Sequence, residues 1–261
     1  MWRFRRCAFA GFVLMVFFAL TAPTYAQGSG MTKVIAHRGH WTPAGAAQNS
    51  IRSFIKADSI NCYGSEFDIW MTGDDVPVVN HDTSFKGVVM EESPSGDVLA
   101  VILDNGETLP RLDNFLEAIR PTSTRLICEV KSHKDKVKEQ KLIKETVKMM
   151  EANGLSPRVE YITFSREGLL NLIKYAPDGT PVYYLNGDMT PAELKSVGAA
   201  GFDYSLSTVR KHPEWFDEAR KLGLKTNVWT VDDEADMQWC IDLGADFITT
   251  NRPERLFRLL W

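Results

Sequence analysis

Short apolar segments alternate with longer segments of helical periodicity from Lys33 to the carboxyl terminus. The short segments are rich in β-branched residues and predict eight strands, at residues 33–37, 64–70, 125–131, 159–164, 181–185, 202–205, 225–230 and 246–250. The longer segments predict eight helices, at residues 49–60, 112–120, 135–153, 166–175, 191–197, 213–222, 233–243 and 253–260. This alternation is typical of a parallel sheet, and eight units in about 225 residues fit a closed barrel better than an open sheet. The pattern therefore predicts the α/β class and a (β/α)8 TIM barrel with a single domain at residues 33–261.

Several predicted helices open with residues that favour a helix start. Ser165 and Asp232 precede two of them, where a side-chain oxygen can accept a hydrogen bond from a free backbone N–H group. Pro191 and Pro253 stand in the first turn of two others, where the missing N–H group of proline costs no hydrogen bond. These residues support the predicted boundaries.

One connection between predicted elements is unusually long. Between Val79 and Arg125 the chain passes through a polar segment at residues 91–96 before the helix that begins at Leu112. Loops of this length in compact domains are more often functional than structureless. We expect this segment to lie at the barrel mouth and to be too polar for the core.

The amino-terminal segment differs in composition from the rest of the chain. Arginines precede an apolar run at residues 8–20, which is followed by Pro23 and by the small residue Ala26. This order predicts a secretory signal peptide at residues 1–26, followed by a short linker at residues 27–32. A membrane anchor is the alternative, but the run is shorter than the ~20 apolar residues that span a bilayer. We expect an exported protein, periplasmic or secreted, with no stable membrane anchor.

Charge and cysteine content exclude some classes of partner. The net charge is −4, and no run of basic residues follows the signal segment, so we expect no nucleic acid partner. Cys62, Cys128 and Cys240 lack the close spacing of a zinc or redox motif, and we interpret them as buried apolar residues, although one disulfide is compatible with an exported protein. The sequence leaves the oligomeric state open.

Polar residues at strand ends are the first candidates for chemistry, because barrel enzymes place their active sites there. The first strand ends in His37 and Arg38, an imidazole beside a fixed cation. The second strand carries Glu66 and Asp68 on one face, since side chains alternate along a strand. Two buried carboxylates so close together indicate either a shared proton or a bound cation.

A third carboxylate favours the cation. The third strand ends with Glu129 and Lys131, again on one face. With Glu66 and Asp68, Glu129 completes an all-oxygen ligand set that suits one divalent cation, Mg²⁺ or Ca²⁺. The alternative is a purely structural ion pair between Glu129 and Lys131.

A second histidine follows the carboxylate strand. His81 ends an apolar run and can face His37 across the cation, so the two imidazoles could activate a nucleophile and protonate a leaving oxygen. Three carboxylates, one divalent cation, Arg38 and Lys131 together give a pocket charge near +1, which matches a phosphodiester monoanion. The residues therefore predict phosphodiester cleavage.

The motifs resemble those of the glycerophosphodiester phosphodiesterase family. Its signature elements occur here in order as His37-Arg38-Gly39, Glu66-Phe67-Asp68, His81-Asp82 and Glu129-Val130-Lys131. Residues 227–231 and 246–253 also resemble the family's seventh and eighth strands, so the likeness covers almost the whole mature chain.

The resemblance implies a metal-dependent phosphoric diester hydrolase that converts small-molecule glycerophosphodiesters to glycerol 3-phosphate and an alcohol. It implies the following roles: metal ligation by Glu66, Asp68 and Glu129, acid-base catalysis by His37 and His81, and substrate binding by Arg38, Lys131 and Trp229. Core packing is the alternative for Trp229.

One departure from the family pattern concerns the segment after the first strand. The family usually has Glu-Asn-Thr, whereas this chain has Gln48-Asn49-Ser50. If the usual Glu holds the metal or orients His37, the change affects metal preference or substrate scope. The Asn49-Ser50 pair is also expected to cap the first helix, and we favour this role for Ser50.

Three alternatives differ in substrate or in activity. A related barrel phosphodiesterase acting on lipids would need an exposed apolar or basic rim, which the sequence does not suggest. A glycosidase would have no use for Arg38 and Lys131 beside three carboxylates. A non-catalytic exported protein that binds phosphodiesters is favoured only by Gln48.

Overall fold

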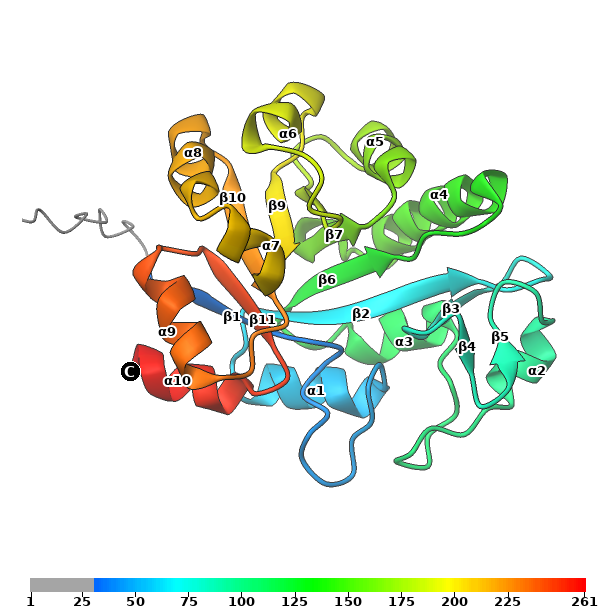
Figure 1. The fold of residues 1–261 in the computed structure, drawn as a ribbon. Helices are drawn as coiled ribbons and strands as arrows, with labels where there is room; N and C mark the ends of the chain where they lie inside the picture. Colours follow the sequence, from blue (N-terminus) through cyan, green and yellow to red (C-terminus); the bar gives the residue numbers. More distant parts are fainter. Residues whose placement is uncertain (1–30) are drawn as a thin grey trace, which may run out of the picture.

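The computed structural model describes residues 31–261, and its strands form a closed parallel barrel with helices outside it (Figure 1). The barrel strands are β1 (Lys33–Ala36), β2 (Gly64–Met71), β6 (Arg125–Val130), β7 (Val159–Thr163), β8 (Val182–Tyr184), β9 (Gly201–Ser205), β10 (Lys225–Trp229) and β11 (Phe247–Thr250). They pair in the order β1-β11-β10-β9-β8-β7-β6-β2, and β2 also pairs with β1, which closes the ring. The predicted single-domain (β/α)8 barrel is confirmed.

Each barrel strand is followed by a helix on the outer side of the barrel. These helices are α1 (Ile51–Ser59), α3 (Leu112–Ile119), α4 (Lys136–Ala152), α5 (Arg166–Tyr175), α6 (Pro191–Val197), α8 (Glu214–Leu222), α9 (Glu234–Asp242) and α10 (Pro253–Leu260). A short helix, α7 (Leu206–Lys211), was not predicted. It begins directly after β9, capped by Ser205, and its six residues are too few to display a helical period.

Alternation along the strands creates two apolar layers. Inward residues such as Ile35, Ile127 and Ile162 form a cluster inside the barrel, whereas outward residues such as Phe67 pack against the helices. The next inward positions after Ile35 and Ile127 are His37 and Glu129. The same alternation that fills the barrel therefore directs these polar side chains into its carboxyl-terminal mouth.

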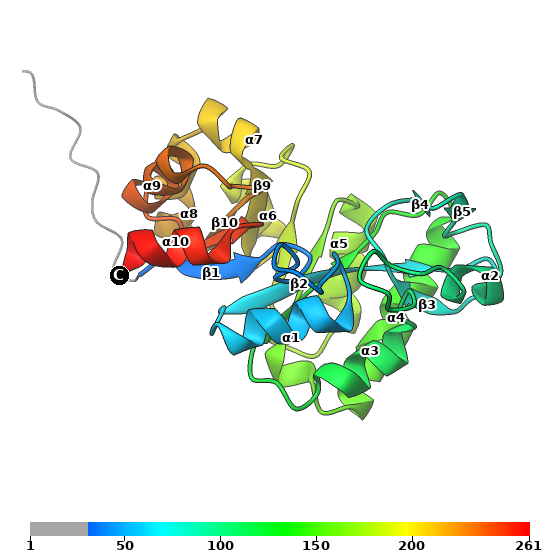
Figure 2. The same ribbon diagram turned by 90° about the horizontal axis from the view of Figure 1, so that it is seen from below.

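The segment between β2 and α3 is folded, contrary to the prediction of a long loop. It contains β3 (Pro77–Val79), which pairs antiparallel with β2, the hairpin of β4 (Ser84–Phe85) and β5 (Val88–Val89), and α2 (Ser95–Leu99). Together these elements project beyond the end of β2 (Figure 2). They enclose a third apolar cluster that includes Trp70, Val78, Met90, Val98 and Leu109. The polar residues 91–96 are all partly or fully exposed at the edge of this cluster. Their composition therefore did not indicate the apolar cluster beside them.

Most of the predicted helix starts are confirmed. The Ser50 and Ser165 side chains cap α1 and α5, and Pro191 and Pro253 occupy the first turns of α6 and α10. The prediction that Asp232 caps the following helix is wrong, because Asp233 accepts the capping bond from Ala235 N.

A partly buried aspartate near the end of α1 forms hydrogen bonds with the segment before β6. Asp58 Oδ1 accepts bonds from the backbone N–H groups and hydroxyls of Ser123 and Thr124, at 2.9–3.1 Å. Partial burial would raise the pKa of Asp58, but these bonds hold it below its ordinary value. Ionised Asp58 therefore stabilises the fold above its unfolded-state pKa, and this contribution is lost as pH falls through the lowered pKa.

Asp58→Ala should lower the free energy of unfolding at neutral pH by about 1–3 kcal/mol, because four donors lose their acceptor. Urea denaturation should show the deficit shrinking at acidic pH. The exposed Asp178→Ala variant should unfold like the parent protein at both pH values. An equal deficit at neutral and acidic pH would contradict this role of the charge.

The predicted signal peptide at residues 1–26 lies outside the described residues, as does most of the linker at residues 27–32. Within residues 31–261, no helix is long and apolar enough to cross a membrane. Cys62, Cys128 and Cys240 are buried free thiols, which confirms their interpretation as apolar core residues.

Candidate active site

A cavity of about 400 Å³ opens at the carboxyl ends of the barrel strands. Its lining residues are His37, Arg38, Glu66, His81, Glu129, Lys131, Ile162, Phe164, Leu185, Asp203, Trp229 and Thr230. Asp68 is fully buried beside this lining. The eight side chains singled out from the sequence therefore gather at one end of the barrel.

A tight turn at Arg38 and Gly39 follows β1. Arg38 and Gly39 have φ angles of +54° and +80°, in the left-handed region. A Cβ atom on Gly39 would lie 2.3 Å from Ser53 Oγ, so only glycine fits here. Arg38 Nη1 donates to Gln48 Oε1 at 2.7 Å.

Three carboxylates converge as predicted. Asp68 on β2 lies opposite Glu129 on β6 in the strand register, and Glu66 precedes Asp68 on the same face. All three are buried, and one oxygen of each lies within 4.8 Å of the others. Because the strands are neighbours in the sheet, the rigid backbone fixes this spacing.

Crowding makes the carboxylates hard to ionise together. Burial, followed by the charge of Asp68, raises the pKa of both Glu66 and Glu129, that of Glu129 to about 8. Burial alone would also raise the pKa of Asp68, but Lys131, His81 and a bond from Asn49 hold it below its ordinary value. In the protein alone, Asp68 is the member that carries charge at neutral pH.

This ligand set fits a hard divalent cation. Carboxylate oxygens from rigid neighbouring strands are the donors that Mg²⁺ and Ca²⁺ prefer. A double positive charge at this point would offset the repulsion that now keeps Glu66 and Glu129 protonated.

Hydrogen bonds from β11 and its loop hold the ring of His37. Asn251 Oδ1 accepts from Trp41 Nε1 at 3.1 Å, and Asn251 Nδ2 donates to Asp232 Oδ2 at 2.7 Å. The oxygen of Asn251 therefore faces His37 Nδ1, at 2.8 Å, so this ring nitrogen must donate. His37 Nε2 is then the free acceptor, 3.7 Å from Glu66 Oε1.

His81 has a different partner. Its Nδ1 lies 2.7 Å from the carboxylate of Asp82, the next residue in the chain. Burial lowers the pKa of His81, opposed by the charge of Asp68 and by the hydrogen bond to Asp82. Burial and Arg38 lower the pKa of His37 further, to about 4.

Lys131 is an ion-pair partner and also a cavity residue. Its Nζ lies 2.7 Å from Glu129 Oε1 and 3.4 Å from Asp68 Oδ1. The predicted alternative of a structural pair with Glu129 is thus realised as a contact. Because Lys131 also lines the cavity, the contact leaves its charge available to a ligand.

The segment after β1 supports two site residues. Gln48 binds Arg38, so it orients the guanidinium group. Asn49 donates to Asp68 Oδ2 at 2.8 Å and accepts from Asp68 N at 3.1 Å. The capping role expected for Asn49 is wrong, since Ser50 alone caps α1 with its side chain, and Asn49 positions a carboxylate.

Trp229 lines the cavity and is partly buried, and it also packs against the apolar cluster inside the barrel. Its ring packs edge-to-face on Phe164, with centroids 5.6 Å apart. These two rings form an apolar part of the cavity wall.

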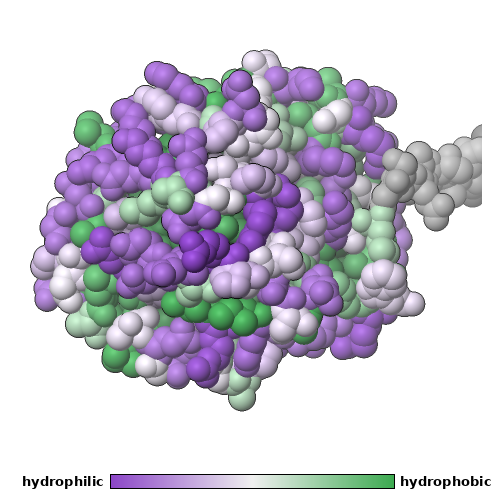
Figure 3. Space-filling view, turned by 180° about the vertical axis from the view of Figure 1, so that it is seen from behind, coloured by the Kyte–Doolittle hydropathy of each residue, from purple (hydrophilic) through white to green (hydrophobic). Residues whose placement is uncertain are grey.

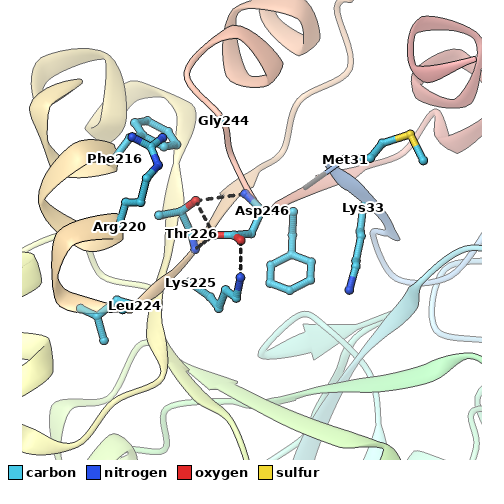
Figure 4. A pocket seen from close by; sticks show the side chains of 11 residues that line it. Met31, Lys33, Phe216, Arg220, Leu224, Lys225, Thr226, Gly244 and Asp246 are labelled. Atoms are coloured by element: carbon cyan, nitrogen blue, oxygen red, sulfur yellow. Dashed lines mark hydrogen bonds and ion pairs between the residues drawn. The ribbon is translucent and has the colours of Figure 1, made fainter. Parts of the chain in front are cut away.

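Another pocket lies at the opposite end of the barrel (Figure 4). Its charged side chains are used within the fold. Lys225 Nζ pairs with Asp246 Oδ1 at 2.6 Å, Thr226 N donates to Asp246 Oδ2, and Arg220 donates to the Leu243 carbonyl. These contacts stabilise the fold at the amino-terminal end of the barrel, so we assign this pocket no ligand.

Comparison with known proteins gives one consistent result. The profile of the Glycerophosphoryl diester phosphodiesterase family matches residues 37–255. A protein named Glycerophosphodiester phosphodiesterase from Caldanaerobacter subterraneus subsp. tengcongensis is 29% identical over 244 residues, which cover 88% of this chain and 98% of that protein.

Solved structures are similar over nearly their whole length. A glycerophosphodiester phosphodiesterase from Parabacteroides distasonis is 40% identical, with a TM-score of 0.87 over 89% of this chain and 98% of that chain. An Oleispira antarctica phosphodiesterase, solved in complex with the product sn-glycerol-3-phosphate, shares the fold at 20% identity and a TM-score of 0.72, over 87% of this chain and 96% of that chain.

Proposed function

Because this chain belongs to the glycerophosphoryl diester phosphodiesterase family, it is a phosphodiesterase of glycerophosphodiesters, and we propose that it works with a divalent cation and a pair of histidines. One observation carries this proposal. A buried carboxylate trio, two imidazoles and two fixed cations surround a single cavity.

Arg38 and Lys131 bind the phosphodiester anion. Both line the cavity, and each is held by a neighbour, Arg38 by Gln48 and Lys131 by Glu129. Fixed cations stabilise the charge that grows on phosphoryl oxygens in the transition state. A divalent cation held by Glu66, Asp68 and Glu129 would supply further charge stabilisation at the same phosphoryl group.

His37 acts as the general base. Its Nδ1 donates to an amide oxygen, so Nε2 carries the lone pair, and its lowered pKa keeps the ring neutral at neutral pH. An amide partner gives little stabilisation to an imidazolium. His37 Nε2 therefore accepts a proton from the attacking group, which is water or the neighbouring hydroxyl of glycerol.

His81 acts as the general acid. Its Nδ1 faces the carboxylate of Asp82, which stabilises the protonated ring against the burial that lowers its pKa. In the protonated ring Nε2–H is the donor. This contact gives a role to the Asp that follows His81 in the sequence. His81 donates its proton to the leaving oxygen, and the products are glycerol 3-phosphate and an alcohol.

A direct product assay tests the proposed function. The protein, freed of metal and refilled with Mg²⁺ or Ca²⁺, should release glycerol 3-phosphate from choline, ethanolamine, inositol or glycerol diesters. A cyclic phosphate among early products would identify the neighbouring hydroxyl of glycerol as the nucleophile, and its absence would identify water. No release from any of these diesters would refute the proposal.

The described surface favours soluble diesters over intact lipids. Large exposed apolar side chains, such as Ile55, Val137 and Leu170, are dispersed over different elements. The face shown in Figure 3 is mainly hydrophilic, with apolar residues in separate patches. Soluble glycerophosphodiesters should therefore be cleaved and phospholipid in liposomes should not.

We also propose export. The support is the order of arginines, apolar run and Ala26 in the first residues of the sequence. Mass spectrometry of the protein from the envelope or medium should find Gln27 at its amino terminus.

A further inference from the structure

An acidic residue outside the trio lies in the same cavity. Asp203 is on β9, where the strand register places it beside Asn227 on β10. Its side chain is only 1% exposed, yet it is part of the cavity lining. The mechanism above assigns it no role.

One oxygen of this buried carboxyl group has no hydrogen-bond partner among the described residues. The unpartnered atom is Asp203 Oδ1, and the neighbouring Asn227 Oδ1 is unpartnered as well. Asn227 Nδ2 donates one of its two hydrogens to Thr249 Oγ1 at 2.9 Å, and Asp203 Oδ1 receives neither of them. Buried polar atoms are rarely left without a partner, so a free oxygen in a cavity wall indicates a ligand group.

Much of the cavity wall that includes Asp203 is apolar. Ile162, Phe164 and Leu185 line the same cavity, and Trp229 Nε1 donates to the Asp203 carbonyl oxygen at 2.9 Å, which fixes the tryptophan next to Asp203. One carboxyl group in an apolar wall suits a small polyol, whose carbon faces contact the rings while a hydroxyl bonds to the carboxyl group.

Charge does not oppose this arrangement. Burial raises the pKa of Asp203 to about 8, so the group is mostly neutral at neutral pH. A neutral carboxyl group offers both a donor and an acceptor, as a hydroxyl group requires, and does not repel a phosphate nearby.

We propose that Asp203 determines specificity for the glycerol moiety by hydrogen-bonding one of its hydroxyl groups through the free Oδ1 atom. This inference rests on the proposed function, since it assigns the wall of Ile162, Phe164, Trp229 and Asp203 to glycerol. The alcohol that leaves then lies on the opposite side, past His81. A second cavity, lined by Trp41, Phe85 and His81 among others, adjoins it there.

A pair of diesters that differ only in hydroxyl groups tests the inference. Glyceryl 4-nitrophenyl phosphate carries the two hydroxyls, and propyl 4-nitrophenyl phosphate lacks both. Asp203→Ala should lower kcat/KM for the glyceryl diester by about 10- to 100-fold, mostly through KM, because one hydrogen bond is lost. It should change kcat/KM for the propyl diester by less than about threefold.

Three further variants protect the test against a folding defect. Asp203→Asn keeps a donor and an acceptor and should retain the preference for the glyceryl diester. Asp203→Val fills the space without a polar atom and should behave like Asp203→Ala. Thr249→Val removes the partner of Asn227 but leaves the cavity lining unchanged. It should keep the parent's preference for the glyceryl diester, whatever it does to the melting temperature.

Calorimetric binding of glycerol 3-phosphate and propyl phosphate repeats the comparison without turnover. Asp203→Ala should weaken only the binding of glycerol 3-phosphate. Equal losses for both ligands, or no loss for either, would overturn the assignment of Asp203. Failure of the parent protein to cleave the glyceryl diester would instead count against the proposed function. Failure with the propyl diester alone would indicate that the glycerol hydroxyl is the nucleophile, and in both cases the binding comparison decides the role of Asp203.

Discussion

The double variant His37→Ala, His81→Ala should lose at least about 10⁴-fold in kcat/KM for a glycerophosphodiester, because both proton transfers lose their catalyst. The two rings line one cavity and have distinct partners, Asn251 for His37 and Asp82 for His81. Each single variant should lose about 10²- to 10⁴-fold. Steady-state assays with saturating cation, together with thermal unfolding curves, measure these effects.

The two histidines should also respond differently to the leaving group. An activated leaving group such as 4-nitrophenolate needs little protonation, so it should restore much of the activity of His81→Ala and little of that of His37→Ala. The matched control is His212→Ala, since His212 is partly exposed and stacks on Trp215 outside the cavity lining. Near-normal activity of the double variant would remove the histidines from the mechanism.

Removal of divalent cations should reduce activity by at least about 10³-fold, and Mg²⁺ or Ca²⁺ should restore it. The reason lies in the carboxylate trio, where burial and mutual repulsion raise the pKa of Glu66 and Glu129. A cation that binds only the folded protein should also raise its melting temperature with concentration. In Asp68→Asn this shift should disappear along with the activity.

A surface acid provides the matched control for the cation. Asp97→Asn removes an exposed carboxylate from α2, and the cation should still raise its melting temperature and support its activity. Binding of the cation should weaken as pH falls, because protons compete with it for carboxylates whose pKa is raised, such as Glu129. Full activity after thorough chelation would contradict a role for the trio in cation binding.

Much of the barrel could be predicted from local patterns. A strand exposes alternate side chains to opposite faces, so the positions of Glu66, Asp68 and Glu129 followed from the two-residue period and the apolar residues between them. The same rule and the ordered family motifs placed His37, Arg38 and Lys131 at strand ends. The cavity confirms that these residues share one site, while their roles stay predictions.

The segment after β2 shows where patterning fails. Its strands are only two or three residues long, which is too short for a period to be visible. Its apolar cluster also includes Ala47 and Trp70, which lie earlier in the chain than this segment. Local patterns therefore predicted a polar loop where the protein forms a third apolar cluster.

The sequence by itself determined the barrel, the inward direction of the carboxylates and the identity of the residues at the strand ends, because these depend on neighbours within one strand. Only the tertiary structure decided how those residues are held. Asn251 reaches His37 across 214 positions of sequence because β1 pairs with β11 when the barrel closes. Closure likewise put the free oxygen of Asp203 into the cavity. Such contacts depend on which strands become neighbours in space, and no spacing along the chain records that.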